Sequence, residues 1–323
     1  MEYRKLGKWG VRVSEVALGS WLTYGGSVQE KESIEQVHYA YEHGVNFFDT
    51  ANVYAHGVAE QVIGKALAKI KRDDIFLATK VFFPMGNGPN DRGLSRKHVI
   101  EQCRASLKRL NTDYVDLLQC HRYDPETPVE ELVKTMEILT TQGKILYWGV
   151  SEWPAAKIQE AMDVARQLGA PPPVSNQPAY NMLYRDIETD VIPVSEKNGL
   201  GQVVFSPLAQ GVLTGKYLPG QPPPRDSRAA GPNAAFLQHR DSMSKENLEK
   251  VQQLSKVAQE LGLSMAQLAL AWILRLPAIS SVIIGATKRS QIEDNLKAAG
   301  IKLTPETLKR IEGILASELV TQS

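Results

Sequence analysis

The sequence of 323 residues predicts an α/β fold, a (β/α)8 barrel that occupies residues 1–323 as a single domain. It contains eight short runs rich in Val, Ile, Leu and Phe, the composition of buried parallel strands. Longer stretches with helical periodicity separate most of these runs. Most runs begin about 30 residues after the previous one, which is the length of one strand and one helix. An open, doubly wound parallel sheet is the alternative fold.

The expected strands are the eight apolar runs themselves. They lie at residues 15–19, 45–48, 75–79, 114–118, 145–149, 174–176, 202–205 and 281–284. Their order along the chain predicts that each strand lies beside the next, with a helix packed outside each connection.

Several residues between the runs have the positions of helix-end signals. Ser95 is placed as an N-cap, and Thr127 as a second N-cap before Pro128 at the first helical position and Glu130 at the third. Gly169 is placed to end the helix that begins near 153–154. Further helices are expected at residues 33–41, 245–261, 264–275, 289–298 and 304–315.

Two segments interrupt the strand-helix period. Residues 3–13 form two short alternating runs around a Gly-containing turn, which predicts a β-hairpin that caps the bottom of the barrel. Residues 218–240, after the seventh strand, are rich in Pro, Gly, Arg and Asp. A loop of this length in a compact domain is typical of a lid or a binding loop.

Composition excludes several classes of protein. The 37 basic and 36 acidic residues leave a net charge of +1, so we expect neither a nucleic-acid backbone nor an anionic membrane as partner. The two cysteines are too few for a disulfide framework. The first residues lack the apolar segment of a secretion signal, and no run of about 18 apolar residues occurs, so we expect a cytoplasmic protein without membrane insertion.

Polar residues follow the apolar runs. The catalytic site of such a barrel lies at the C-terminal ends of its strands, so these residues are expected to converge on one rim. In chain order they are Asp49, Lys80, His121, Ser151, Gln177, Ser206 and Gly285, with Tyr54 just beyond Asp49.

Four of these residues together suit proton transfer. A Tyr hydroxyl has a pKa near 10 and becomes a useful acid when a neighbouring Lys ammonium stabilises its anion. A carboxylate keeps that Lys charged, and a His donates to a carbonyl oxygen. Each residue also has a simpler interpretation when it is taken singly. Asp49 suits a helix cap or loop acid, and Lys80 a charge at the end of a strand. Tyr54 suits an aromatic residue at the rim, and His121 an ordinary loop histidine. The six His residues lack metal-ligand spacing, so no metal is expected.

Several motifs over nearly the whole chain resemble the aldo-keto reductases. They include residues 48–54, Ala59-Glu60 with Gly64, and residues 206–217. Residues 93–98, 147–149 and 281–286 are most similar to the branch of that family that contains the beta subunits of voltage-gated potassium channels.

The resemblance implies NADPH-dependent reduction of a carbonyl, with Tyr54 as general acid, Lys80 lowering its pKa, Asp49 holding Lys80 and His121 orienting the substrate oxygen. It also implies a set of cofactor-binding residues. Ser151 and Gln177 would hold the nicotinamide carboxamide, and Phe205 would stack on the nicotinamide. The pyrophosphate and adenosine ends would be held by Ser206, Leu208, Gln210, Lys216, Gly285, Thr287, Gln291, Asp294 and Asn295.

The sequence departs from the family pattern at three places. Channel beta subunits carry Asn at the position of His121, so the histidine favours real turnover. Glu152 replaces the Asn or Arg that often follows the carboxamide serine. The usual 2′-phosphate ligands do not align, so Lys288, Arg289 or Arg228 would have to bind that phosphate. We expect NADPH rather than NADH.

Two functions remain open at this stage. The first is reduction of aldehydes or ketones, whose substrate would meet an aromatic wall of Trp21, Tyr54, Phe82, Phe83 and Trp153, although Phe82 and Phe83 equally suit a packing role. The family resemblance implies that Trp21 walls either the nicotinamide or the substrate cleft. The second is a cofactor-sensing subunit of a membrane channel with little turnover. The branch resemblance implies a homotetramer, and a monomer is common in the family.

Overall fold

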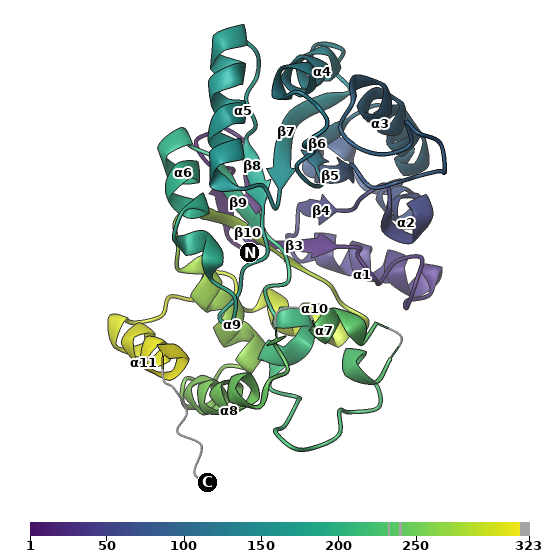
Figure 1. Ribbon diagram of the computed structural model, residues 1–323. Helices are drawn as coiled ribbons and strands as arrows, with labels where there is room; N and C mark the ends of the chain where they lie inside the picture. The colour runs from purple at the N-terminus through teal and green to yellow at the C-terminus, as the bar shows by residue number, and fades with distance from the viewer. Residues whose placement is uncertain (232, 239–240, 317–323) are drawn as a thin grey trace.

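A closed barrel of eight parallel strands forms the centre of the molecule, as predicted (Figure 1). The computed structural model describes residues 1–231, 233–238 and 241–316. Each barrel strand pairs with the next along the chain, and the last pairs with the first. The strands are β3 (Val16–Gly19), β4 (Phe47–Asp49), β5 (Phe76–Val81), β6 (Val115–Cys120), β7 (Ile145–Ser151), β8 (Ser175–Gln177), β9 (Gly201–Val204) and β10 (Ile279–Ile284).

Helices cover the outside of the barrel, and their apolar faces form the main core against the strands (Figure 1). They are α1 (Glu30–Glu42), α2 (Val58–Leu67), α3 (Arg96–Leu110), α4 (Val129–Thr141), α5 (Ala155–Leu168), α6 (Val191–Asn198), α8 (Lys245–Glu260), α9 (Met265–Leu274), α10 (Arg289–Leu296) and α11 (Pro305–Ala316). Short 3₁₀ segments occur at η1 (Tyr54–Gly57), η2 (Arg72–Asp74), η3 (Asp186–Glu188) and η4 (Ala209–Thr214). The structure contains each of the five further helices expected at residues 33–41, 245–261, 264–275, 289–298 and 304–315.

Helix ends test the capping predictions directly. The Ser95 hydroxyl accepts from the His98 backbone N–H, and Gly169 ends α5 in a left-handed conformation, so both predictions are confirmed. The prediction for Thr127 is wrong, because Pro128 occupies the N-cap position of α4. The Thr127 hydroxyl donates instead to Asp124 Oδ2 at 2.8 Å.

The N-terminal hairpin closes the bottom of the barrel, as predicted. Strands β1 (Tyr3–Lys5) and β2 (Arg12–Ser14) pair antiparallel. The hairpin residues Leu6 and Val13 share one buried cluster with inward residues of the strands, among them Phe47, Phe76 and Leu117. The turn needs glycine, since Gly7 has φ +60° and an added Cβ would lie 2.3 Å from the Gly199 carbonyl oxygen.

The long segment after β9 has some regular structure that the sequence does not predict. It contains η5 (Arg228–Ala230) and α7 (Ala235–Gln238). Residues 232, 239 and 240 of the predicted loop lie outside the described residues. In the part of the chain that the structure describes, no single helix is long and apolar enough to span a membrane; α8 and α9 reach that length and composition only together, with a bend of 91° between them.

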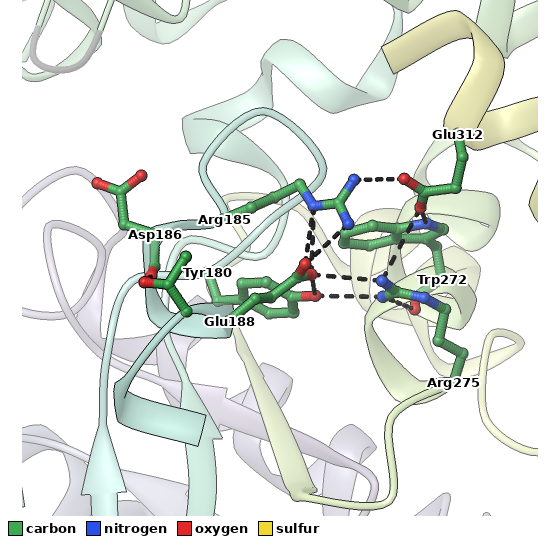
Figure 2. A network of polar contacts seen from close by, with 8 residues as sticks. Tyr180, Arg185, Asp186, Glu188, Trp272, Arg275 and Glu312 are labelled. Carbon is green, nitrogen blue, oxygen red and sulfur yellow. Dashed lines mark hydrogen bonds and ion pairs between the residues drawn. The ribbon is translucent and has the colours of Figure 1, made fainter. Parts of the chain in front are cut away.

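A polar network joins the segment after β8 to α9 and α11 (Figure 2). Glu188 binds Arg185 at 2.8 Å and Arg275 at 3.3 Å, and it accepts a short hydrogen bond from Tyr180. The Arg275 guanidinium lies 3.5 Å from the centre of the Trp272 ring. The network therefore fixes α9 against the chain that leaves β8.

Replacing Glu188 by alanine should lower the free energy of unfolding by about 1–3 kcal/mol, because both arginines lose a charged acceptor. Urea unfolding measures the change. Glu30→Ala is the matched control, since Glu30 pairs with Lys65 on the open surface and should cost no more than about 1 kcal/mol. Equal losses in the two variants would contradict a supporting role for the network.

Candidate active site

Alternation along the strands brings the expected site residues to the inside of one rim. Side chains two residues apart point to the same face of a strand. Inward residues Phe47, Ala78 and Leu117 lie in the bottom cluster, so Asp49, Lys80 and Gln119, each two residues later, point into the barrel above them. The same two-residue alternation along β6, β7, β8 and β9 also brings four further side chains to this rim, those of His121, Ser151, Gln177 and Phe205.

An ion pair between Lys80 and Asp49 forms the centre of the site. Lys80 Nζ donates to Asp49 Oδ2 at 2.5 Å and to the Thr50 carbonyl oxygen at 2.8 Å. Its third neighbour is the hydroxyl of Tyr54, 3.3 Å away. The Lys80 side chain has no exposed surface, and that of Asp49 is 4% exposed. Three of the four residues predicted to act together, Asp49, Lys80 and Tyr54, are therefore in contact.

Two amides hold the other oxygen of Asp49. Gln177 Nε2 donates to Asp49 Oδ1 at 3.0 Å, and Gln119 Nε2 approaches the same atom at 3.4 Å. The sequence prediction missed Gln119. The signal was available, because Gln119 is a polar residue in an apolar strand and stands two residues before His121, on the same face.

Burial and charge shift the pKa of both titratable partners of Asp49. Burial is the largest single influence on Lys80 and lowers its pKa, but the charge and hydrogen bond of Asp49 together with those of Tyr54 outweigh it, so the net pKa of Lys80 is raised. Burial also raises the pKa of Tyr54 above its ordinary value, and the Lys80 ammonium opposes the rise. Lys80 thus acts in the predicted direction, while burial decides the net shift. Both groups keep their protons at neutral pH.

His121 lies beside Tyr54 and is 7% exposed. Its ring contacts Tyr54 edge-on, with 5.7 Å between centroids, and Phe83 in the same way at 4.8 Å. Burial, followed by the charges of Lys80 and Arg122, lowers the pKa of His121 well below its ordinary value. The imidazole is therefore neutral at pH 7, and its Nδ1 is a buried nitrogen without a hydrogen-bond partner among the described residues.

The residues predicted to bind the carboxamide support one another. Ser151 Oγ donates to the Gln177 backbone oxygen at 2.9 Å, while the Gln177 side chain donates to Asp49. The next residue, Glu152, has a left-handed φ of +56° and accepts the Ala179 backbone N–H at 2.6 Å. Glu152, which replaces the Asn or Arg found at this position in many family members, therefore has a structural role.

The expected aromatic wall divides into two parts. Trp21, Tyr54, Phe82 and Phe83 are half-buried near the strand ends, and Phe82 contacts Phe83 edge-on at 5.2 Å. Trp153 is only 2% exposed and contacts Tyr123 within the main core. In this structure Trp153 is therefore part of the core and exposes almost no surface.

The backbone after β9 is left-handed at several residues, which costs free energy and is typical of binding loops. These are Ser206, Ala209, Gln210 and Gly211, with φ from +45° to +100°. An added Cβ at Gly211 would lie 3.1 Å from Lys216 Nζ, so a side chain there would crowd the lysine. Arg228 donates to Gln210 at 3.1 Å, and Leu208 packs at the edge of the core. This loop therefore suits a phosphate group.

The turn after β10 carries the residues predicted for the adenosine end. Gly285 faces open space, and Gln291 accepts the Thr287 backbone N–H at 2.8 Å. Asp294 uses both carboxylate oxygens to accept from Ser264 and Gln267, so it braces the start of α9. Asn295 is buried beside it.

Two exposed basic residues stand at the start of α10. Lys288 pairs with Asp226 of the long loop at 3.0 Å, and the Arg289 guanidinium lies 4.1 Å from the Tyr39 ring centre. The ion pair between Lys288 and Asp226 joins the loop after β9 to the turn after β10. The basic groups predicted for the 2′-phosphate therefore lie on connected segments.

No group of three or more His, Cys, Asp or Glu side chains is arranged to hold a metal ion within residues 1–231, 233–238 and 241–316. The polar centre described above consists instead of one ion pair, a tyrosine, a neutral histidine and amides. A model of the aldo/keto reductase family matches residues 15–316. The chain belongs to the aldo/keto reductase family. This membership supports an oxidoreductase activity broadly.

Similar proteins carry the name of the branch suggested by the sequence motifs. Proteins of Arabidopsis thaliana and Oryza sativa subsp. japonica, each named "Probable voltage-gated potassium channel subunit beta", are 46% identical over 323 residues, which cover 98% of both chains. A relative in Schizosaccharomyces pombe, also named as a voltage-gated potassium channel subunit beta, is 44% identical over 97% of this chain and 93% of its own length. The resemblance to this branch is confirmed.

The lowered pKa of His121 predicts a specific acid sensitivity. Below pH 6.5 the unfolded chain protonates this histidine and the folded chain does not, so stability falls with pH until the depressed pKa is reached. Wild type should lose up to about 2 kcal/mol more than His121→Gln between pH 7 and pH 5, as measured by urea unfolding.

His56→Gln, at an exposed histidine, is the control for that comparison. Burial also lowers the pKa of His98, but this residue is common to every variant and its contribution cancels. If wild type and His121→Gln lose the same stability between the two pH values, His121 is not buried in its neutral form.

Proposed function

We propose that the protein reduces aldehydes or ketones to alcohols with NADPH, and that Tyr54 donates the proton. The observation that carries this proposal is the fully buried Lys80, held by Asp49 at 2.5 Å and set 3.3 Å from the Tyr54 hydroxyl. A permanent ammonium beside a phenol stabilises the tyrosinate that remains after proton transfer.

Each residue then has a separate task. Tyr54 is protonated at neutral pH, and burial raises its pKa further above the ordinary value, so it enters the reaction as an acid. Lys80 remains charged because Asp49 faces it, and Gln177 and Gln119 hold the other oxygen of Asp49. His121 is neutral, so it orients and polarises the carbonyl oxygen by a hydrogen bond and does not compete as the proton source.

The chain's own residues suit a nicotinamide cofactor along the rim from β7 to α10. Ser151, Gln177 and Phe205 would hold the nicotinamide end. When bound, the cofactor supplies the hydride. The left-handed loop at residues 206–211, with Lys216 and Arg228, would receive the pyrophosphate. Gly285, Thr287, Gln291 and Asn295 would line the adenosine end, with Asp294 supporting them through α9.

A second function deserves a separate test because relatives at 44–46% identity are named as channel beta subunits. In that role the protein would bind the cofactor tightly, turn over slowly and sit beside a membrane channel, as a tetramer or a monomer. We favour the reductase because His121 completes the reductase residue set, and we place the protein in the cytoplasm.

Tyr54→Phe should lower kcat for NADPH oxidation with 4-nitrobenzaldehyde by about 10²- to 10⁴-fold, since it removes only the donated proton. The dissociation constant for NADPH, measured by fluorescence quenching, should stay within about threefold because the ring remains. Tyr123→Phe is the matched control, at a half-buried tyrosine that contacts Trp153.

Near-wild-type turnover by Tyr54→Phe would rule out Tyr54 as the acid. Negligible turnover by the wild type itself, together with tight NADPH binding, would favour the sensing subunit.

Cofactor choice tests the basic residues at the start of α10. The double variant Lys288→Ala with Arg289→Ala should weaken NADPH binding by about tenfold or more and leave NADH binding nearly unchanged, because only NADPH carries the 2′-phosphate. Titration calorimetry gives both dissociation constants. Lys309→Ala, an exposed lysine on α11, is the control. Equal effects on the two cofactors would remove Lys288 and Arg289 from this role.

A further inference from the structure

Arg122 is a cation next to the catalytic centre that the chemistry above leaves without a task. It directly follows His121, is half-buried, and donates through Nη1 to the His121 carbonyl oxygen at 2.5 Å. Its guanidinium lies 5.5 Å from the centre of the Phe83 ring, and Phe83 in turn contacts His121. The remaining donors of the guanidinium have no carboxylate partner among the ion pairs of the described residues.

Asp124, the carboxylate nearest to Arg122 in sequence, is hydrogen-bonded to other groups. Asp124 Oδ2 accepts the Leu94 backbone N–H at 2.7 Å and the Thr127 hydroxyl at 2.8 Å. Asp124 Oδ1 accepts the Glu126 backbone N–H at 3.0 Å. Asp49 is paired with Lys80, and neither Asp49 nor Asp124 forms an ion pair with Arg122 in the described part of the chain.

The same Asp124 holds the loop that carries Arg122. Its bonds to Leu94 and Thr127 join the loop after β5 to the loop after β6. The loops meet closely, because an added Cβ at Gly93 (φ +88°) would lie 2.7 Å from Asp124 Oδ2, and the Gly93 N–H donates to the Phe82 carbonyl oxygen at 2.7 Å. Arg122 and Phe83 are therefore held in place before any substrate arrives, which reduces the entropic cost of binding.

We propose that Arg122 recognises a carboxylate on the substrate, so that the preferred substrates are aldehydes or ketones that carry a carboxylate a short distance from the carbonyl. A half-buried guanidinium without a counter-ion is costly, and a planar carboxylate offers two acceptors that match its fork. Adjacency to His121 places the two recognition points close together: the imidazole for the carbonyl oxygen, the guanidinium for the anionic group. This inference rests on the proposed reductase function.

The electrostatic effect of Arg122 reaches both catalytic side chains. It is among the charges that lower the pKa of His121 and oppose the rise in the pKa of Tyr54. Neutralisation by a substrate carboxylate would therefore be felt at the site of proton transfer as well as in binding.

The test compares matched substrates that differ only in charge. One pair is 4-oxobutanoate and its methyl ester, and a second, with different spacing, is 4-carboxybenzaldehyde and its methyl ester. Wild type should prefer the carboxylate member of at least one pair in kcat/KM at fixed ionic strength. In Arg122→Gln the ratio of carboxylate to ester should fall by about 10- to 100-fold, mostly through KM. Arg122→Lys should lie between the two.

The ratio separates recognition from folding, because a general structural defect lowers both members of a pair together. Arg104→Gln, at an exposed arginine of α3, should leave the ratio unchanged. An unchanged ratio in Arg122→Gln, or the lack of a carboxylate preference in wild type for both pairs, would overturn the inference.

A binding measurement separates this inference from the reductase function. Calorimetry compares 4-hydroxybutanoate with its neutral amide, on wild type and on Arg122→Gln, each loaded with NADP+. If the protein shows no turnover but binds the carboxylate in a way that depends on Arg122, the reductase proposal is contradicted and the anion site is supported. Equal binding of the acid and the amide to wild type would contradict the proposed anion site and leave the reductase proposal standing.

Discussion

The ammonium of Lys80, enclosed in the barrel and paired with Asp49, is the interaction on which the rest of the site depends. Removing an ion from water costs several kcal/mol, and only close, fully bonded partners offset that cost. Lys80 has three such neighbours: the carboxylate of Asp49, the backbone oxygen of Thr50 and the hydroxyl of Tyr54. The buried charge therefore dictates what surrounds it, including the two amides that hold Asp49.

The barrel separates stability from chemistry along its own axis. At the bottom, Leu6 and Val13 of the hairpin seal an apolar layer with Phe47, Phe76 and Leu117. At the top, the same strand faces change from apolar to polar within two residues, and backbone strain collects in the loops, for example at Glu152, Ser206 and Gln210. The apolar layer holds the strands that carry these loops, and the outer network around Trp272 holds α9 against the segment after β8.

Local signals in the sequence predict the strands, most helices and the four central residues, because apolar composition and strand ends are local properties. Contacts between distant segments are not local. Gln119 lies 70 residues from Asp49, and the Asp124 bond that fixes the loop of Arg122 reaches back 30 residues to Leu94. Thr127 shows the same limit, since its hydroxyl donates to the carboxylate of Asp124 and caps no helix. Likewise, the burial of Trp153 follows from its contact with Tyr123, which no periodicity reveals.

The turnover of Lys80→Met tests the central claim most directly. Methionine fills much of the same volume without a charge, and Asp49 keeps its bonds to Gln177 and Gln119. The account predicts that kcat for 4-nitrobenzaldehyde falls at least about 100-fold while the dissociation constant for NADPH stays within about threefold. Turnover within about threefold of wild type would contradict the claim that the buried ammonium drives the chemistry at Tyr54.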